Sequence, residues 1–417
     1  MTTPPISAPL SPWRQLLQDL SPSALLSGLV AVIVGIAGPT VLVYAVAASA
    51  HLPERAVLSW VWASTVICGL VTVLLSLRTR QPILSTWSTP GIAFLATALP
   101  GHSLPEAAGA FVVSGLLVVL LGTLPPLTRL MQRIPGPLAA ALNAAILLPF
   151  GFHAVQALTR QPLLVGGMIA AYVGLRVLAP RWAVAGVLGA GIVLSAVLGL
   201  LHHVAIPLAP VHPQLLRPEF SLRGVLDLAL PLTLLAFTGQ VVPGMAVLQT
   251  LGYRPPAGLI VRTTGVASVA AAFVGCHSLT LGALLANIVA GPEAHPDPKR
   301  RYVAAVTAGT LNIVVGSFAG TFLAVMSVLP QDAITALAGL ALLAAMASSL
   351  QAALQGPGGR LAAPTVLIVT LSGIAPLGIG AAFWGILAGL AVHALERPRA
   401  ARPAPAPTVP VPDPNAR

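Results

Sequence analysis

The chain reads STWSTPG at residues 85–91 and GCHSLTLG at residues 275–282, and each stretch interrupts an otherwise apolar segment. Both place hydroxyls, glycines or a proline where a membrane helix would favour Leu, Val and Ala. Backbone that breaks at membrane depth is tolerated only where it is buried in protein or lines a cavity. Two such breaks in corresponding halves of a chain point to a transporter's binding site.

The composition is that of a polytopic membrane protein. Of the 417 residues, 56% are hydrophobic and 7% are charged, whereas a soluble domain carries roughly 25% charged residues. The two cysteines, Cys68 and Cys276, lie in apolar segments, so no disulfide framework is predicted. The sequence has no P-loop, no H-E-x-x-H motif, no G-x-S-x-G motif and no Cys/His cluster. We therefore expect neither an ATP-driven pump nor an enzyme, and no cofactor or metal site.

The apolar runs predict about fourteen transmembrane segments, several of them shorter than the roughly 20 residues that cross a bilayer. With both termini in the cytoplasm, seventeen of the 21 Lys and Arg residues fall on the inside and four on the outside. This positive-inside bias accounts for the net charge of +11, so nucleic-acid binding is not needed to explain it. The predicted segments are residues 24–48, 57–77, 82–99, 107–125, 137–157, 162–178, 183–203, 225–250, 258–275, 278–291, 302–328, 333–354, 361–376 and 377–395.

A weak internal repeat relates the two halves of the chain. The break at residues 85–91 aligns with residues 276–282, and seven segments separate the two. An odd number of segments inverts the second half in the membrane, as in many secondary transporters. The predicted parts are a cytoplasmic N-terminal tail (1–20), a first seven-segment repeat (21–203), an inverted second repeat (204–395) and a disordered Pro-rich tail (396–417).

Hydroxyls next to the breaks predict two helix starts that face the middle of the membrane. Thr89 before Pro90 has the residue types of an N-cap followed by Pro at the first helical position, and Ser278 before Leu279 can act as the second cap. Helix N-termini offer N–H groups and the positive end of the helix dipole, which suit an anion, particularly a carboxylate. The alternative is that each stretch is a kink whose hydroxyls satisfy neighbouring carbonyls.

No acidic residue lies in the interior of a predicted segment, since Asp227 and Asp332 lie at outside ends, and this leaves histidine as the candidate proton carrier. His277 lies near the membrane centre, with a neutral packing role as the alternative. Gln240, in the eighth segment, either bonds backbone or faces a ligand, Trp87 can line a pocket for a ring, and Asn143 is expected to bond another helix. The candidate binding residues are Ser85, Thr86, Trp87, Ser88, Thr89, Gly91, Gln240, Cys276, His277, Ser278, Leu279 and Thr280.

These stretches resemble a known family. Residues 275–295, supported by residues 85–91 and 238–244, resemble the signature of bacterial benzoate:proton symporters, the BenE family, and the resemblance covers about residues 25–395. It implies the all-α fold of nucleobase:cation symporters and sulfate-permease-type anion carriers, with fourteen segments as two inverted repeats of seven. Segments 1–4 and 8–11 would form a core domain and segments 5–7 and 12–14 a gate domain. Substrate would lie between the broken third and tenth segments, facing the eighth.

The resemblance implies uptake of benzoate, or a similar aromatic carboxylate, with a proton across the bacterial inner membrane. The nucleobase carriers resembled here use a glutamate in the eighth segment, where this chain has Gln240, and the difference fits an anionic substrate. A nucleobase or inorganic-anion carrier of the same fold is one alternative, and an uncoupled channel or membrane scaffold is another. Expected partners are the aromatic acid, a proton and membrane lipid. A homodimer through the gate domain is a candidate assembly.

Overall fold

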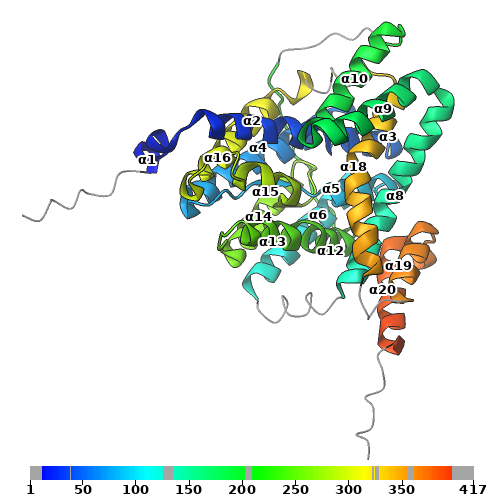
Figure 1. Cartoon of the computed structure of the whole chain (residues 1–417). Coiled ribbons are helices and arrows are strands. Elements are labelled where there is room, and N and C mark those ends of the chain that lie inside the picture. The colour runs from blue at the N-terminus through cyan, green and yellow to red at the C-terminus, as the bar shows by residue number, and fades with distance from the viewer. Residues whose placement is uncertain are drawn as a thin grey trace, which may run out of the picture.

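The computed structural model describes residues 12–37, 39–124, 135–201, 209–321, 324, 328–355 and 361–396. In this part of the chain the protein is almost entirely helical (Figure 1). Of the two predicted tails, residues 1–11 and 397–417 lie outside the described residues.

The helices coincide with the predicted apolar segments. Up to residue 201 the elements are α1 (Pro12–Asp19), α2 (Pro22–Ala37), α3 (Pro39–Ser49), α4 (Glu54–Thr79), β1 (Ser85–Trp87), α5 (Thr89–Ala98), α6 (Leu104–Thr123), α8 (Gly136–Arg160), α9 (Pro162–Leu178), η1 (Pro180–Trp182) and α10 (Ala183–Val197). From residue 222 they are α11 (Leu222–Gly224), η2 (Val225–Ala229), α12 (Leu230–Ala236), η3 (Phe237–Val241), α13 (Val242–Thr250), α14 (Ala257–Ala272), β2 (Leu279–Leu281), α15 (Ala283–Ala290), η4 (Pro298–Arg300), α16 (Tyr302–Ser317), α18 (Gln331–Leu354), α19 (Ala362–Leu371), η5 (Pro376–Gly378) and α20 (Ala381–Glu396).

Several helices are long and apolar enough to cross a membrane. Among the described residues, five continuous helical stretches are long and apolar enough to cross a membrane by themselves, and the shorter apolar helices have 10 to 17 residues. The structure is therefore that of a polytopic helical membrane protein. The count of fourteen segments and the inverted repeat stay predictions.

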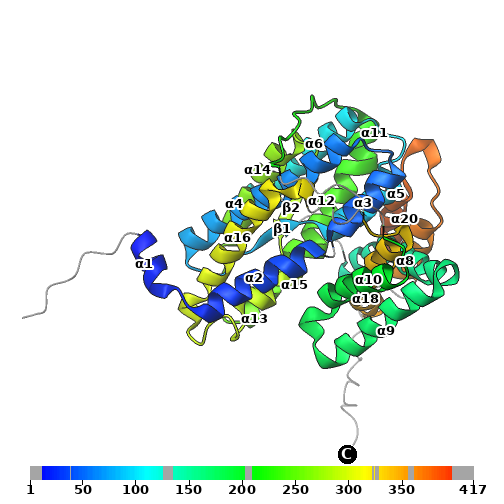
Figure 2. The same cartoon turned by 90° about the horizontal axis from the view of Figure 1, so that it is seen from above.

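The helices pack as two bundles, which are most distinct in Figure 2. In the first, called the core bundle here, α4 packs on α16, α14 on α6, and α2 on α16. In the second, the gate bundle, α8 packs on α18 and α19, α19 on α20, and α9 on α10. These memberships are the ones that the family resemblance implied for the core and gate domains. The bundles meet where α5 and α12 of the core contact α8 of the gate.

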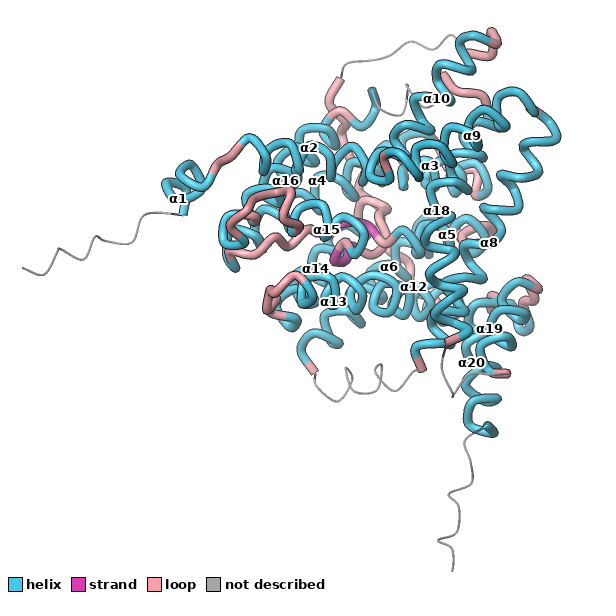
Figure 3. Tube along the Cα trace, in the orientation of Figure 1, coloured by secondary structure: helices cyan, strands magenta, loops and turns pink. Residues whose placement is uncertain are grey.

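Two three-residue strands lie at the centre of the core bundle (Figure 3). β1 and β2 pair antiparallel, with Ser85 opposite Leu281 and Trp87 opposite Leu279. Each strand leads into a short helix, β1 into α5 and β2 into α15. Buried backbone without a hydrogen-bond partner is costly in an apolar medium, and each strand supplies the partner that the other lacks. The sequence predicted the breaks but not this pairing.

The loops at one end of the core bundle are basic. Asp19 of α1 forms ion pairs with Arg80 (3.8 Å) and Arg300 (3.2 Å). The Gln81 side chain donates to the carbonyl of Arg254 at 3.2 Å. The loops that follow α4, α13 and α15 therefore meet at this end, where the charge distribution predicts the cytoplasm.

Residues 209–221 cross the opposite end of the core bundle. Backbone N–H groups of this segment donate to the carbonyls of Ser317, Phe273 and Pro105, through Val211 (2.9 Å), Leu216 (2.7 Å) and Glu219 (2.8 Å). The connection between the two halves thus lies on the end that the charge distribution assigns to the outside. The orientation itself stays a prediction.

Candidate functional site

The first break ends at a capped helix N-terminus. Ser88 is the N-cap of α5, and its hydroxyl accepts the Gly91 N–H at 3.2 Å. The predicted cap, Thr89, is instead the first helical residue, so the assignment was wrong by one position. Trp87 is the last residue of the strand, which leaves Ser88 in the extended conformation that a cap requires.

The second break is organised differently from the prediction. α15 begins at Ala283 after Gly282, which has no side chain with which to cap it, so Ser278 is not the cap of this helix. Ser278 precedes β2, and its hydroxyl lies 3.3 Å from that of Ser114 in α6, which in turn lies 3.0 Å from the Thr233 hydroxyl in α12. The hydroxyl of Ser278 therefore joins a buried network that ties the break to two neighbouring helices.

His277 holds the two breaks together. Its Nδ1 atom accepts the indole N–H of Trp60 at 3.2 Å, and its Nε2 atom lies 3.1 Å from the carbonyl oxygen of Ser88. Because an indole only donates and a carbonyl only accepts, these two bonds define a neutral imidazole with its proton on Nε2. The Trp60 and Phe111 rings meet the imidazole edge to face. His277 thus positions the cap residue of α5.

Several predicted site residues use their polar groups within the core bundle. The Ser85 hydroxyl donates to the Thr280 carbonyl at 3.1 Å, and its N–H donates to the Thr72 hydroxyl at 2.9 Å. The Thr280 hydroxyl donates to the Thr86 carbonyl at 3.4 Å, and the Cys276 thiol donates to the His277 carbonyl at 3.3 Å. Strand pairing brings these residues together, but their hydrogen bonds are internal, as the kink alternative predicts.

The eighth segment faces the start of α5 through an irregular turn. Gln240 is buried in the π-helical turn η3, which contacts β2 and α8. A Cβ added to Gly239 would lie 3.3 Å from the Pro90 ring, so α5 and η3 are in close contact. π-Helical turns are rare and are frequent at functional sites. The first turn of α5 and the Gln240 turn therefore form two adjacent walls.

The gate bundle supplies a polar pair beside these walls. Asn143 of α8 donates through Nδ2 to the Ser349 hydroxyl of α18 at 2.7 Å, which is a bond between helices as predicted. Its Oδ1 atom is buried and accepts no hydrogen bond among the described residues. Gly239 lies next to this oxygen. Asn143 and Ser349 were not among the candidate binding residues, because one amide in an apolar run carries no further signal.

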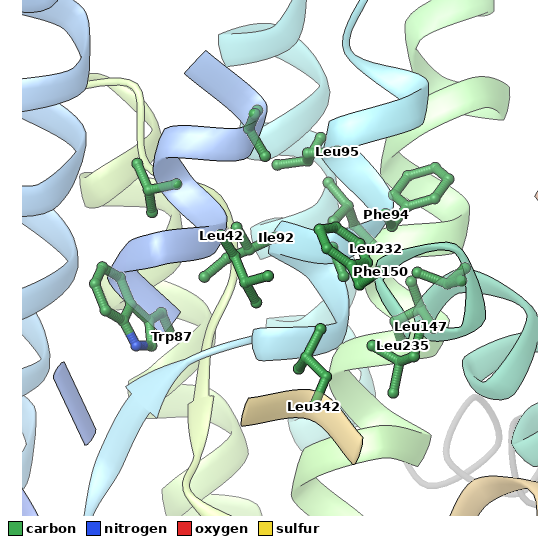
Figure 4. Packing of buried hydrophobic residues seen from close by; sticks show 14 of the residues in the cluster. Leu42, Trp87, Ile92, Phe94, Leu95, Leu147, Phe150, Leu232, Leu235 and Leu342 are labelled. Carbon is green, nitrogen blue, oxygen red and sulfur yellow. The ribbon is translucent and has the colours of Figure 1, made fainter. Parts of the chain in front are cut away.

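Apolar side chains fill the seam between the two bundles. Figure 4 places Phe94 and Leu232 of the core beside Leu147 and Phe150 of the gate, whereas Trp87 lies apart from them, near Leu42. Trp87 is buried in this apolar cluster. Phe94 and Leu232 thus mark the surface on which the core bundle meets the gate bundle.

Two small cavities lie in the core bundle, and one of them borders the strand pair. One, of about 20 Å³, is lined by residues that include Ser64, Ser85 and Thr86, and the other, of about 10 Å³, by residues that include Trp60 and Phe111. An apolar cavity that holds benzene measures about 150 Å³. An aromatic acid therefore fits neither cavity.

The fold and the site together define a membrane transport protein rather than an enzyme. The family model described as "Benzoate membrane transport protein" (BenE) matches residues 18–395. The chain belongs to this family.

Two curated proteins are similar to the chain over most of its length. A benzoate membrane transport protein of Acinetobacter baylyi is 36% identical over 388 residues, which are 93% of this chain and 98% of that protein. The inner membrane protein YdcO of Escherichia coli is 38% identical over 371 residues, which are 89% of this chain and 95% of that protein.

Solved structures of two transport proteins share the fold. SLC26A9 superposes with a TM-score of 0.64 at 13% identity, over 92% of this chain and 67% of that one. The transmembrane domain of the cyanobacterial bicarbonate transporter BicA superposes with a TM-score of 0.60 at 15% identity, over 90% of this chain and 97% of that one. At such low identity the likeness shows the fold alone, and it agrees with the sulfate-permease-type architecture that the sequence predicted.

Proposed function

We propose that this protein is a secondary active transporter that takes up benzoate, or a related aromatic carboxylate, together with a proton. The observation that carries the proposal is the capped N-terminus of α5, which packs against Gly239 in the turn that also holds Gln240. Family membership and the printed name of the Acinetobacter relative support the same substrate. The printed name of the Escherichia relative supports the bacterial inner membrane as the location.

The carboxylate is held by neutral donors in this proposal. The first turn of α5 supplies the Thr89 N–H together with the positive end of the helix dipole, since Pro90 has no N–H and the Gly91 N–H is bonded to the Ser88 hydroxyl. Gln240 supplies an amide donor. The ring packs near Trp87, which lies in the apolar cluster beside the first turn of α5. A glutamate at the position of Gln240 would repel a carboxylate, whereas an amide does not.

Access to the site alternates by movement of the core bundle against the gate bundle. The two cavities of the core bundle are too small for an aromatic acid, so the bundles must separate before the substrate enters. The seam at Phe94 and Leu232 is the surface along which they separate.

Both termini are in the cytoplasm, and a homodimer forms through the gate bundle.

His277 carries or relays the coupled proton in this proposal. In the closed conformation both ring nitrogens are occupied, so a second proton on Nδ1 requires that Trp60 first release it. That release requires a rearrangement within the core bundle, because α4 and the break both belong to it. The neutral imidazole of the closed state is then one of two states in the cycle.

Uptake by reconstituted proteoliposomes tests the proposal. An inward-directed proton gradient, with the outside more acidic, should drive labelled benzoate above its equilibrium level. Protein-free liposomes correct for diffusion of the undissociated acid. Competition by uracil, sulfate and substituted benzoates separates an aromatic-acid carrier from the nucleobase and inorganic-anion alternatives. An uncoupled channel would equilibrate benzoate without accumulating it, and a scaffold would give no flux.

The variant His277→Gln tests the proton route. Glutamine can still donate to the Ser88 carbonyl and accept from the Trp60 indole, so we expect benzoate binding to survive while pH-driven accumulation is lost. Binding is measured by thermal shift against benzoate concentration. Unchanged accumulation by this variant would remove His277 from proton coupling.

A further inference from the structure

A cluster of charged side chains lies where the end of the core bundle opposite Arg80 meets the gate bundle. His102, in the loop between α5 and α6, has its Nε2 atom 2.9 Å from Asp227 Oδ2 and its Nδ1 atom 3.0 Å from Glu106 Oε2. The side chain of His102 is 1% exposed and that of Asp227 is 7% exposed. The contact with Glu106 has the distance of an ion pair but not the alignment of a hydrogen bond.

The geometry of the cluster requires one added proton, on His102 or on Glu106. A neutral imidazole has one N–H and one lone pair, so one ring nitrogen would set its lone pair against a carboxylate oxygen. An imidazolium, or a protonated Glu106, removes that repulsion. Arg223 of α11 is the other charged group that acts on Glu106, and its guanidinium lies against Gly101. With one proton added, the two cations and two carboxylates balance; without it, the buried cluster is left with an excess negative charge.

Asp227 connects this cluster to the gate bundle. Its second oxygen, Oδ1, accepts the backbone N–H of Gly380, in the linker before α20. A Cβ on residue 380 would collide with the same carboxylate oxygen, so glycine is required for the contact. The charged groups thus lie in the core, and the group they hold lies in the gate. Any separation of the bundles at this end must break the bond between Asp227 and Gly380.

We propose that His102, Glu106 and Asp227 form a proton-operated latch, which closes the external end of the transporter when a proton binds from that side. The inference rests on the proposed proton-linked uptake and adds a second proton site, distinct from His277. The latch proton returns to the side from which it came whenever this end reopens. It therefore changes the rate at which the transporter closes and not the number of protons carried per substrate.

The sign of the effect follows from the partners of His102. The hydrogen bond with Asp227 raises the pKa of His102 above its ordinary value, against the opposing effect of burial, and Glu106 adds to the increase. A protonated His102 also holds Asp227 with Oδ1 directed at the Gly380 N–H, so acid on the external side favours the closed latch and alkali releases it. A single proton linked to one step changes its equilibrium by at most about tenfold per pH unit.

The test is exchange of labelled benzoate in proteoliposomes with equal total benzoate on both sides, measured as the initial unidirectional flux. The internal pH is fixed and the external pH is varied from about 6 to 8.5. We expect the wild-type exchange rate to depend on external pH more steeply than that of His102→Asn, by up to about tenfold per pH unit, because the variant keeps only the dependence that comes from the transport proton. His51→Asn is the matched control, because His51 is exposed and its φ of 50° suits asparagine.

A second measurement separates the latch from the transport proton. The proton-to-benzoate ratio, obtained from the gradients at which net flux is zero, should be the same in His102→Asn and the wild type. An altered ratio, or an external pH profile like that of the wild type, would overturn the latch. If His102→Asn does not fold, Asp227→Asn must give the flattened profile instead. A wild-type protein that moves no benzoate at any pH would refute the proposed function itself.

Discussion

Gly91→Ala tests whether the first turn of α5 is fixed against His277. A Cβ at residue 91 would lie 3.0 Å from His277 Cδ2 and 3.1 Å from both Leu232 Cδ2 and Ser88 Cβ. Carbon atoms in contact normally lie about 3.5–4.0 Å apart. Leu232 can rotate away, but His277 is held by Trp60 and by the Ser88 carbonyl. The added methyl group must therefore move α5.

Two effects of opposite sign determine how far Gly91→Ala changes the free energy of unfolding. Overpacking a closed core costs typically about 1–3 kcal/mol, and alanine in place of glycine in a helix recovers up to about 1 kcal/mol. We therefore expect the free energy of unfolding to fall by about 0–3 kcal/mol. The shift of the α5 N-terminus should weaken benzoate binding by about tenfold, which corresponds to about 1.4 kcal/mol.

The quantities measured are the KM for benzoate uptake and the midpoint of thermal unfolding of the detergent-solubilised protein. Gly174→Ala in α9 is the matched control, since nothing lies within 4 Å of a Cβ at that position, and it should leave KM unchanged and stability equal or higher. If Gly91→Ala has the KM and the thermal midpoint of the wild type, the close contact between α5 and His277 does not exist in the working protein.

Three further predictions follow from the same contacts. Ser88→Ala removes the α5 cap and should lower the free energy of unfolding by about 1 kcal/mol and raise the KM for benzoate uptake. Ser88→Asn can still cap the helix, so both changes should be smaller. Gln240→Glu adds a negative charge beside the proposed carboxylate site and should reduce benzoate uptake more than tenfold; normal uptake would show that residue 240 does not face the substrate. Because the pKa of His102 is raised, its stabilising contribution is complete below about pH 6.5 and is lost as the pH rises through the higher folded value. The thermal midpoint of the wild type should therefore exceed that of His102→Asn most below pH 6.5, and an equal difference at pH 9 would contradict this.

The sequence carried the positions of the breaks but not their internal geometry. Hydroxyls next to a proline indicate that a helix begins nearby, and α5 does begin there. The cap is Ser88 and not Thr89 because the strand keeps the chain extended up to residue 88. Ser278 has the same chemistry but precedes a strand, so its hydroxyl bonds Ser114 across the bundle. Local composition cannot separate these cases, because the partner strand is about 190 residues away in the chain.

Two irregular turns of the eighth segment could have been predicted from the prolines in the sequence. The π-helical turns η2 and η3 each end two residues before a proline, Pro231 and Pro243. A proline has no N–H and its ring collides with the carbonyl four residues earlier, so the preceding turn widens. Two prolines twelve residues apart in one apolar segment therefore indicate two such turns. Trp60, in contrast, had no signal, since nothing in its own segment marks it as the partner of His277.

The packing of the helices bears on the predicted repeat. α4 packs on α16 and α6 packs on α14, which in predicted order are segments 2 with 11 and 4 with 9. α9 with α10 and α19 with α20 are segments 6 with 7 and 13 with 14. A shift of seven segments converts each pairing into the other. Related pairings of this kind are what an inverted repeat requires, and they could be anticipated from the sequence only through the alignment of the two breaks.

The proposed site uses partial charges for an electrostatic reason. Residues 82–99, 275–291 and 229–250 contain no Lys, Arg, Asp or Glu, so an anion between these segments meets only backbone N–H groups, amides and hydroxyls. A helix N-terminus is equivalent to roughly half an elementary charge, whereas an arginine would present a full one in a medium where charge pairs interact strongly. A carrier must bind its substrate firmly enough to load it and weakly enough to release it on the other side. Neutral donors at a buried helix start meet both conditions, and they leave the negative charge of the carboxylate to be balanced by the proton that accompanies it.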